Sequence, residues 1–337
     1  MTHMLKGFKA ALPALALAIP VAVPVVTAGP AAAQSYPTQP IQLICSTSPG
    51  SGAARWCEMI REELAKPEYL GVPINVAYMS GGANHEPAVY VHNRPADGYT
   101  ILHGNASYHG QFNLPHFTVS PDDFTVVARF EQTIYGVGVL CSDPELNSWE
   151  DVVNYARANP GALAMGSNKV GSLHHLHHIR ITRDPNGADI RFVPYEGTGD
   201  VVRDVVGGHL RIGFAQPGLW NPHIEAGTIC PLMIMNEDRL THPLWADVPS
   251  VHDVGLTYDV PHQWQGFLVK AGTPDSVMDA IADALQKVTT SEAYAAYLAQ
   301  NPHVVPAYIR DRAYLNEDFA REVAATRQFM IDVGLMQ

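Results

Sequence analysis

The sequence is poor in charge, and especially in positive charge. Only 16% of its 337 residues are charged, and 21 Lys and Arg stand against 33 Asp and Glu. The first 33 residues hold Lys6 and Lys9 and no acid, so the remaining chain has 19 basic residues and a net charge of −14. Nucleic-acid binding requires a basic face, and this balance therefore argues against a nucleic-acid partner. A small anion remains compatible with it, because such a ligand responds to the local field of a cleft.

The motifs of several enzyme classes are also missing. The chain has no Gly-x-Ser-x-Gly nucleophile elbow and no phosphate-binding P-loop. The segment Gly50-Ser-Gly52 is too short for a dinucleotide fingerprint, and His85-Glu86 lacks the second His of a zinc protease. We therefore expect a protein that is not an enzyme and that uses no cofactor.

Long apolar runs are confined to the N-terminus. Lys6 and Lys9 precede an apolar stretch at residues 10–26, which prolines interrupt, and Ala31-Ala-Ala33 follows. This order is typical of a secretory signal peptide and not of a membrane span. No later run approaches the ~18 apolar residues of a transmembrane helix. We predict a signal peptide at residues 1–33, cleavage near Ala33 and a soluble, exported mature protein.

Cysteine is scarce: the chain has Cys45, Cys57, Cys141 and Cys230. An oxidising compartment permits disulfides, and one possible arrangement pairs Cys45 with Cys57 and Cys141 with Cys230. Four cysteines allow three connectivities, and the sequence does not choose among them. Four buried free thiols are the alternative.

The sequence does contain a regular alternation of strand and helix patterns. It begins with a buried strand at 41–45, a helix at 53–66 and a strand at 74–77. Further strands are expected at 99–103, 163–165, 191–194, 211–215 and 229–235, and helices at 86–93, up to 159, at 200–206, 277–288, 292–301 and 315–334. This alternation predicts an α/β fold with mostly parallel sheets, and the length suits two lobes.

Four loops rich in Gly, Ser and Asn follow predicted strands and precede predicted helices. They comprise residues 46–52, 104–107, 166–172 and 195–199. Ligands of open α/β sheets bind at the carboxyl ends of the strands, where helix N-termini offer free N–H groups to an anion. Two such loops in each half of the chain therefore suggest a ligand cleft between two sheets.

From about Tyr36 to the C-terminus, a series of short motifs occurs in a characteristic order. Each motif is weak alone, but their order and spacing are specific. They are residues 36–44, Ser48-Pro-Gly-Ser-Gly52, Gly81-Gly-Ala-Asn84, Asp97-Gly-Tyr-Thr100, Val193-Pro-Tyr-Glu-Gly197, Pro222-His-Ile-Glu-Ala-Gly227, Asp247-Val-Pro-Ser-Val251 and Ala271-Gly-Thr-Pro274. In this series the chain resembles the Bug-type receptors of tripartite tricarboxylate transporters.

The resemblance implies a two-lobed periplasmic-binding-protein fold, a type II-like Venus flytrap with the ligand cleft between the lobes. Lobe 1 would hold residues 36–138 and 262–337, lobe 2 would hold residues 139–261, and the hinge would cross near 135–140 and 264–269. The function implied is capture of a small organic acid in the periplasm and its delivery to the membrane subunits of a tripartite tricarboxylate transporter. A ligand sensor that serves a membrane kinase is an alternative on the same scaffold.

The chain also departs from the family pattern at two places. Ala53-Ala54 stand where the family often has Thr-Asp, and Ala215-Gln216 where it has Asp-Asn. A carboxylate lost at the mouth of the cleft removes a natural partner for a ligand ammonium. We therefore expect a dicarboxylate or an aromatic carboxylate in preference to an amino acid.

The candidate ligand-binding residues lie mostly in the four polar loops. Glycine lets the backbone come close to a carboxylate, and the guanidinium of Arg55 matches a carboxylate in a two-point contact. The alternatives are plain strand–helix turns, a solvated Arg55, and core positions for Trp264 and Phe214. The candidates are Ser48, Gly50, Ser51, Gly52, Ala53, Arg55, Asn105, Ser107, Ser167, Asn168, Ser172, His174, Tyr195, Gly197, Ala215 and Trp264.

Four histidines crowd one predicted helix: His174, His175, His177 and His178. His174 and His178 are four residues apart and share a helix face, as zinc-binding pairs do. No Cys or carboxylate at suitable spacing accompanies them, so we expect no metal ligand here. A metal-binding receptor built on this pair remains an alternative, beside contact of His174 with the ligand and an ordinary polar helix face.

Overall fold

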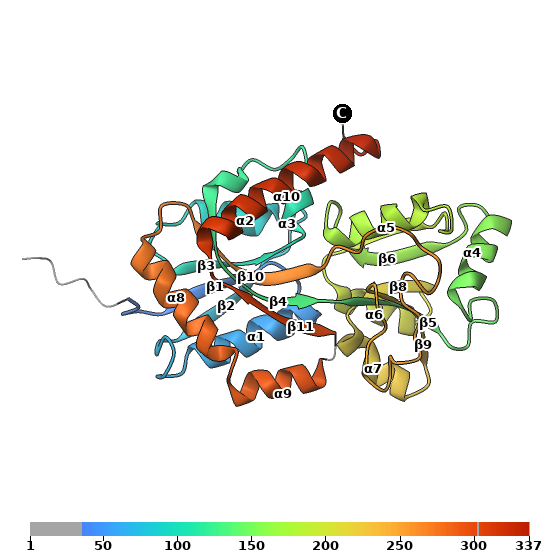
Figure 1. Ribbon diagram of the computed structural model, residues 1–337, viewed down its shortest axis with the longest axis horizontal. Coiled ribbons are helices and arrows are strands. Elements are labelled where there is room, and N and C mark those ends of the chain that lie inside the picture. Colours follow the sequence, from blue (N-terminus) through green and yellow to red (C-terminus); the bar gives the residue numbers. More distant parts are fainter. Residues whose placement is uncertain (1–35, 302, 337) are drawn as a thin grey trace, which may run out of the picture. The chain divides into compact units, whose positions relative to one another are not determined.

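Two mixed β-sheets organise the computed structural model, which describes residues 36–301 and 303–336 (Figure 1). We use lobe 1 for the first sheet with its helices and lobe 2 for the second sheet with its helices. The predicted signal peptide at residues 1–33 lies outside the described residues. Among the described residues, none of the helices combines the length and the apolar composition that crossing a membrane requires.

The sheet of lobe 1 has six strands in the order β11-β4-β10-β3-β1-β2 and takes them from both ends of the chain. The strands are β1 (Ile41–Cys45), β2 (Ile74–Tyr78), β3 (Thr100–Asn105), β4 (Phe124–Thr133), β10 (Gln263–Lys270) and β11 (Val304–Ile309). The helices of this lobe are α1 (Gly52–Leu64), α2 (His85–His92), α3 (Tyr108–Gln111), the 3-10 turn η1 (Pro121–Asp123), α8 (Asp275–Val288), α9 (Glu292–Gln300) and α10 (Arg312–Asp332).

The sheet of lobe 2 has five strands in the order β7-β6-β8-β5-β9. The strands are β5 (Tyr135–Leu140), β6 (Ala164–Asn168), β7 (Arg191–Tyr195), β8 (Ile212–Ala215) and β9 (Ile229–Met235). The helices are α4 (Trp149–Ala158), α5 (Leu173–Arg183), α6 (Thr198–Val206) and α7 (Pro217–Glu225). A disulfide joins Cys141, just after β5, to Cys230 in β9, which is one bond of the possible arrangement considered from the sequence.

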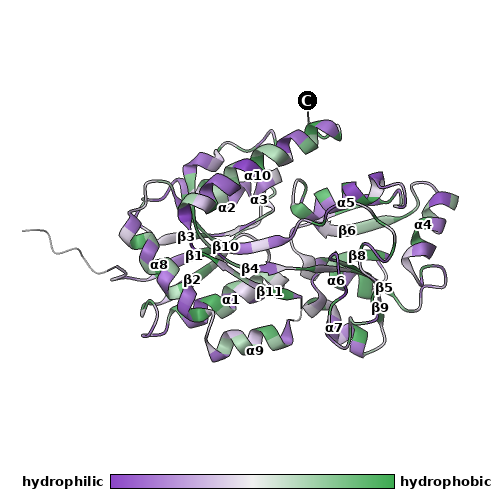
Figure 2. Ribbon diagram, viewed as in Figure 1, coloured by the Kyte–Doolittle hydropathy of each residue, from purple (hydrophilic) through white to green (hydrophobic). Residues whose placement is uncertain are grey.

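Each sheet buries an apolar core on both of its faces. In lobe 1, α1 and α8 cover one face, and α2, α3 and α10 cover the other (Figure 1). In lobe 2, α4 packs on one face, and α6 and α7 on the other. Polar residues appear along β4 and β10 where these strands approach the other lobe (Figure 2). Burial of apolar side chains therefore stabilises each lobe around its own sheet. The polar residues of β4 and β10 lie at the boundary between the lobes.

The expectation of mostly parallel sheets was wrong. Four strand pairings are parallel, and five are antiparallel. The antiparallel ones involve β4, β5 and β10, which carry the chain from one lobe to the other and back. Two neighbouring strands are parallel only when a crossover connection joins them. A strand that enters a lobe and a strand that leaves it run in opposite directions, so they pair antiparallel.

Most single elements were predicted well, and β1 and β9 have the predicted bounds. The C-terminal region was less well predicted, because β11 (Val304–Ile309) separates two helices where only helical patterns were expected. This strand pairs with β4. Its pattern is short and half exposed, and its partner lies about 170 residues earlier in the chain. Pairing over such a separation leaves no local periodic signal.

Candidate functional site

A small polar cavity lies between the two sheets and is closed by side chains of both lobes. Its volume is about 20 Å³, which is room for one water molecule. The walls come from the ends of β1, β3, β6 and β8, from β5 and β10, and from the first turns of α1 and α6. The lining residues are Ser46, Thr47, Ser51, Ala53, His103, Asn105, Tyr135, Asn168, Thr198, Gln216, Gln263 and Gln265. None of these residues is acidic.

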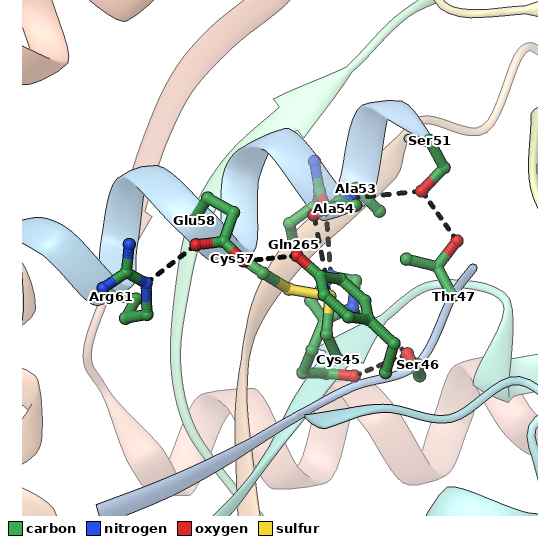
Figure 3. The surroundings of a disulfide bond; sticks show 12 residues. Cys45, Ser46, Thr47, Ser51, Ala53, Ala54, Cys57, Glu58, Arg61 and Gln265 are labelled. Carbon is green, nitrogen blue, oxygen red and sulfur yellow. Dashed lines mark hydrogen bonds and ion pairs between the residues drawn. A yellow bond between two sulfur atoms is a disulfide. The ribbon is translucent and has the colours of Figure 1, made fainter. Parts of the chain in front are cut away.

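The first turn of α1 forms one wall, and a disulfide holds it against β1 (Figure 3). Cys45 at the end of β1 is bonded to Cys57 in α1, as in the arrangement considered from the sequence. Ser51 caps the helix by accepting from the amide of Ala54 at 3.1 Å. Its hydroxyl also lies 2.8 Å from that of Thr47. The turn is thus fixed covalently and by hydrogen bonds.

The first turn of α6, in lobe 2, approaches the loop before α1 at backbone distance. A Cβ added at Gly197 would lie 2.1 Å from Ser48 Oγ, and one at Gly199 would lie 2.8 Å from the carbonyl oxygen of Gly50. Glycine is required here because any side chain would collide. No side chain caps α6. Since a helix N-terminus carries partial positive charge, two first turns beside one cavity favour an anion there.

Gln216 bridges the two first turns from the end of β8. Its side-chain oxygen accepts from the hydroxyl of Thr198 at 2.6 Å, and its amide donates to the hydroxyl of Tyr135 at 3.4 Å. The same amide group would be 2.5 Å from a Cβ at Gly52. Gln216 therefore fills the space between α6 and α1.

The opposite wall is a buried polar network of lobe 1. Gln265 donates to Thr133 at 2.9 Å and to Glu131 at 3.3 Å, so its carbonyl oxygen faces His103 Nε2 at 3.0 Å. His103 Nε2 must therefore carry the proton, and Nδ1 lies 3.1 Å from the hydroxyl oxygen of Ser46. Burial lowers the pKa of His103 to about 4, so the imidazole is neutral.

The network ends on Glu131, which is fully buried. Burial raises its pKa to about 8, while hydrogen bonds from Tyr294 at 3.2 Å and Tyr297 at 3.4 Å act in the opposite direction. A neutral carboxyl group at pH 7 suits this position, because an ionised one would be desolvated without a cation. This wall of the cavity consequently offers dipoles and no net charge.

A lysine side chain, that of Lys169, ends close to the cavity. Its side chain comes from the loop after β6 in lobe 2 and donates to the carbonyl oxygen of Ser46 at 3.0 Å and to Oδ1 of Asn84, both in lobe 1. Only 2% of the residue is exposed. Burial lowers the pKa of the ammonium group to about 7. The loop was singled out from the sequence, but this residue in it was not.

Four of the predicted residues line the cavity: Ser51, Ala53, Asn105 and Asn168. Four more lie directly beside it. Gly52 contacts the side chain of Gln216, which lines the cavity, and Ser48 contacts Gly197 of the other lobe. Ser107 lies within 3.4 Å of Gln263 and accepts from the amide of Leu173 across the lobes at 3.4 Å.

Five predicted residues lie behind the wall of lobe 2. Ser167 donates to a backbone carbonyl of β8, and Ser172 caps α5. His174 packs against the ring of Tyr135, and Ala215 is buried in the core. The hydroxyl of Tyr195 donates to Asp204 at 2.8 Å and is thereby engaged elsewhere.

The remaining three predicted residues lie in other hollows. Gly50 and Arg55 line an outer groove of about 740 Å³, where Arg55 Nη1 donates to the carbonyl oxygen of Gly218 in lobe 2 at 3.2 Å. Trp264 lines a separate cavity of about 360 Å³ with Arg129 and Arg180. Arg55 therefore joins the lobes at the outer edge of the cleft.

Eight lining residues were not predicted: Ser46, Thr47, His103, Tyr135, Thr198, Gln216, Gln263 and Gln265. Ser46, Thr47 and Thr198 lie inside the predicted loops at 46–52 and 195–199, but they were not chosen as candidates there. Gln216 had been noted only as a departure from the family pattern. His103, Gln263 and Gln265 lie on β3 and β10, which are neighbours in the sheet but about 160 residues apart in the chain. No local pattern signals such a pairing.

The geometry of the described residues does not favour the metal alternative. His174 and His178 are buried, and neither belongs to a group of three potential ligands in this part of the chain. The three potential metal ligands that do lie together among the described residues are Cys45, Cys57 and His103. Both of its sulfurs form the disulfide, so they are not thiolate ligands.

Two mixed sheets, joined by strands that cross twice and enclosing a polar cavity, define a two-lobed solute-binding protein. A family model described as the tripartite tricarboxylate transporter family receptor matches residues 59–332. The chain belongs to this family, whose members are substrate-binding receptors and not enzymes.

Individual relatives agree with this assignment. BugT of Bordetella pertussis is 26% identical over 311 residues, which cover 89% of this chain and 92% of BugT. A Rhodopseudomonas palustris protein solved with adipate superposes with a TM-score of 0.79 at 23% identity, covering 89% of this chain and 98% of that one. MatC of the same organism, solved with malate, gives 0.77 at 20% identity, with 87% and 99% covered. The two structures share the fold of this chain.

Proposed function

We propose that this protein is a periplasmic receptor that captures a small organic acid between its lobes and delivers it to the membrane subunits of a tripartite tricarboxylate transporter. The observation that carries the proposal is the cavity where the first turns of α1 and α6 come together. The family supports the transporter, and the predicted signal peptide supports the compartment.

The acid group of the solute binds at the two helix starts. There it gains the partial positive charge of both helices and a hydroxyl donor from Ser51, which lines the cavity. The amide of Asn105, which gives one of its two N–H groups to Ser46, adds a donor along the other wall. Each of these contacts costs little when it forms, because the groups are already oriented by the surrounding hydrogen bonds.

Binding requires motion of the lobes. A cavity of about 20 Å³ is smaller than any organic acid, so the lobes separate to admit the solute. We propose that residues 36–133 with 263–337 and residues 135–261 move as two bodies. The crossings lie at the β4–β5 junction and before β10, slightly earlier than the sequence suggested. A solute that contacts both walls stabilises the closed arrangement over the open one.

The favoured ligand is a carboxylate without an amino group. The cavity lining contains no Asp or Glu that would hold an ammonium group. Relatives solved with adipate and malate make dicarboxylates the first class to test. Aromatic carboxylates are the second.

A thermal-shift screen of the mature protein tests this function. The panel contains adipate, malate, tricarboxylates, benzoate and several amino acids, each at millimolar concentration. We expect at least one acid to raise the melting temperature and the amino acids to leave it unchanged. A ligand at 100 times its Kd stabilises the folded state by about 2.7 kcal/mol. A panel in which no acid raises the melting temperature contradicts the proposal.

Gly199→Ala provides the matched variant. Its Cβ would lie 2.8 Å from the carbonyl oxygen of Gly50, but only when the lobes are closed. We therefore expect the variant to melt at the wild-type temperature without ligand and to lose the shift given by the best acid. An undiminished shift would show that the acid binds outside the cleft.

A further inference from the structure

Lys169 is placed unusually for a lysine of this protein. The chain after residue 33 contains four lysines: Lys66, Lys169, Lys270 and Lys287. Lys287 is exposed, whereas Lys169 is 2% exposed. Its ammonium group leaves lobe 2 and ends between two loops of lobe 1. Lysines are almost never fully buried unless a negative group accompanies them.

The acceptors of Lys169 are neutral and held in place. The carbonyl oxygen of Ser46 follows β1, and Ser46 itself lines the cavity. Asn84 adopts a left-handed backbone with φ of 71° and donates its amide to Gln111 at 3.0 Å, which turns its oxygen toward Lys169. The motif Gly81-Gly-Ala-Asn84 thus ends on an acceptor for this lysine.

In the part of the chain that the structure describes, no carboxylate forms an ion pair with the ammonium group. Among the described residues, no Asp or Glu lies within 4.0 Å of Lys169 Nζ, and Glu196 is the acid whose field acts on it. The charge of Lys169 lowers the pKa of two histidines, His103 and His174, and burial keeps both of them neutral. An ammonium group has three N–H donors, and two of them have acceptors here. One donor is therefore left for a further group.

The acceptors of Lys169 belong to the other lobe, so its burial depends on closure. When the lobes separate, the ammonium group leaves the carbonyl of Ser46 and the amide of Asn84 and becomes hydrated. Closing the lobes removes that water and gives only two neutral acceptors in return. The desolvation of a cation is unfavourable unless a negative charge offsets it.

We propose that Lys169 makes closure of this receptor depend on the charge of its solute. An ionised acid group next to Ser46 supplies the counter-charge that the closed lobes otherwise lack. With one acid group at the starts of α1 and α6 and a second one facing Lys169, the preferred solute is a dicarboxylate. This inference rests on the proposed receptor function and names its substrate class and the residue that selects it.

The first test compares adipate with hexanoate, which has the same six-carbon chain and one acid group. Calorimetric titration of wild type is expected to give about tenfold tighter binding of adipate, the effect of a charge-assisted hydrogen bond. Lys169→Met should bring the two affinities within about twofold of each other. Lys287→Met, at an exposed lysine, is the control and should keep the wild-type ratio. An unchanged ratio in Lys169→Met overturns the inference.

The second test needs no ligand and separates this inference from the proposed function. Small-angle X-ray scattering of the ligand-free proteins measures the radius of gyration, which falls when the lobes close. We expect Lys169→Met to be more compact than wild type and than Lys287→Met, because its closure buries no charge. Equal radii for wild type and Lys169→Met overturn the inference even if adipate binds. Compaction of Lys169→Met supports it even if wild type binds neither acid.

Lys169→Gln is a second uncharged variant, which keeps the inference testable if Lys169→Met misfolds. It is uncharged, as Met is, but keeps a donor for the carbonyl of Ser46 and the side chain of Asn84. The same loss of the adipate preference and the same compaction are expected. A Gln variant with the wild-type preference and radius would show that hydrogen bonding, and not charge, is what matters, and would overturn the inference.

Discussion

The two walls of the cavity are built differently. The wall of lobe 1 is held by the Cys45–Cys57 disulfide and by a buried network through His103, Gln265 and Glu131. The wall of lobe 2 consists of glycine-containing turns and of side chains that reach across to the other lobe, such as Lys169. The second disulfide of the protein joins Cys141, just after β5, to β9 and does not involve the cavity lining.

This difference assigns separate tasks to the lobes. Lobe 1 presents donors and acceptors whose positions are set before any solute arrives. Lobe 2 forms much of its polar contact with lobe 1 only when the cleft is closed. A preorganised wall limits what must be ordered on binding, and a wall that completes its contacts on closure links binding to motion.

Acidification should destabilise both lobes, because one buried neutral histidine lies in the wall of lobe 1 and another lies behind the wall of lobe 2. Burial lowers the pKa of His103 in lobe 1 to about 4 and that of His174 in lobe 2 to about 3, against 6.5 when exposed. A lowered folded-state pKa means that the unfolded chain binds more protons, so stability is lost as the pH falls from about 6.5 toward 4. A group like His103 contributes on the order of 3 kcal/mol.

His174→Phe checks this loss in lobe 2. The ring of Phe retains the packing against Tyr135 and cannot be protonated. Urea unfolding should show the variant to be more stable than wild type at pH 5, with a smaller difference at pH 8. The control is His252→Phe, which replaces an exposed imidazole and leaves the packing around His174 intact. A His174→Phe curve parallel to wild type at all pH values would refute the assignment.

Removing each disulfide in turn should affect the stability of the protein and its affinity for the solute differently. Cys141 and Cys230 close a loop of 89 residues, and Cys45 and Cys57 close one of 12. The chain-entropy relation gives about 4.5 kcal/mol for the longer loop and about 3 kcal/mol for the shorter one. We expect the Cys141→Ala/Cys230→Ala variant to unfold at lower urea concentration but to keep its affinity for the best acid. The Cys45→Ala/Cys57→Ala variant should lose affinity as well, and equal affinity in both variants would show that the loop needs no covalent anchor.

Replacing one glutamine in each wall compares how much the hydrogen bonds of the two walls contribute to stability. Gln265→Met leaves His103 and Glu131 without their common partner in the buried wall of lobe 1, a loss of about 2 kcal/mol. Gln216→Met in lobe 2 loses hydrogen bonds to two hydroxyl groups, Thr198 and Tyr135, and should cost about 1 kcal/mol. Free energies of unfolding in urea measure both. A larger loss for Gln216→Met would mean that the wall of lobe 2 is the more rigid one.

Much of the fold was accessible from local patterns. The alternation of strands and helices was predicted, because each element buries a periodic apolar face that the sequence itself displays. The parallel character of the sheets and the strand β11 were mispredicted, since strand partners far apart in the chain leave no local trace. At the site, Ser51, Ala53, Asn105 and Asn168 were found because Gly- and Ser-rich loops at strand ends are recognisable.

The sequence by itself determined the two apolar cores, the family, and the loops that end on the cavity, because all of these follow from residue types in chain order. Only the tertiary structure decided which cysteines are bonded and which side chains meet. It placed His103 beside Gln265 across two strands, and it buried Lys169 between loops of the other lobe. The reason is physical: the state of a charge depends on which groups surround it, and those groups come from distant parts of the chain.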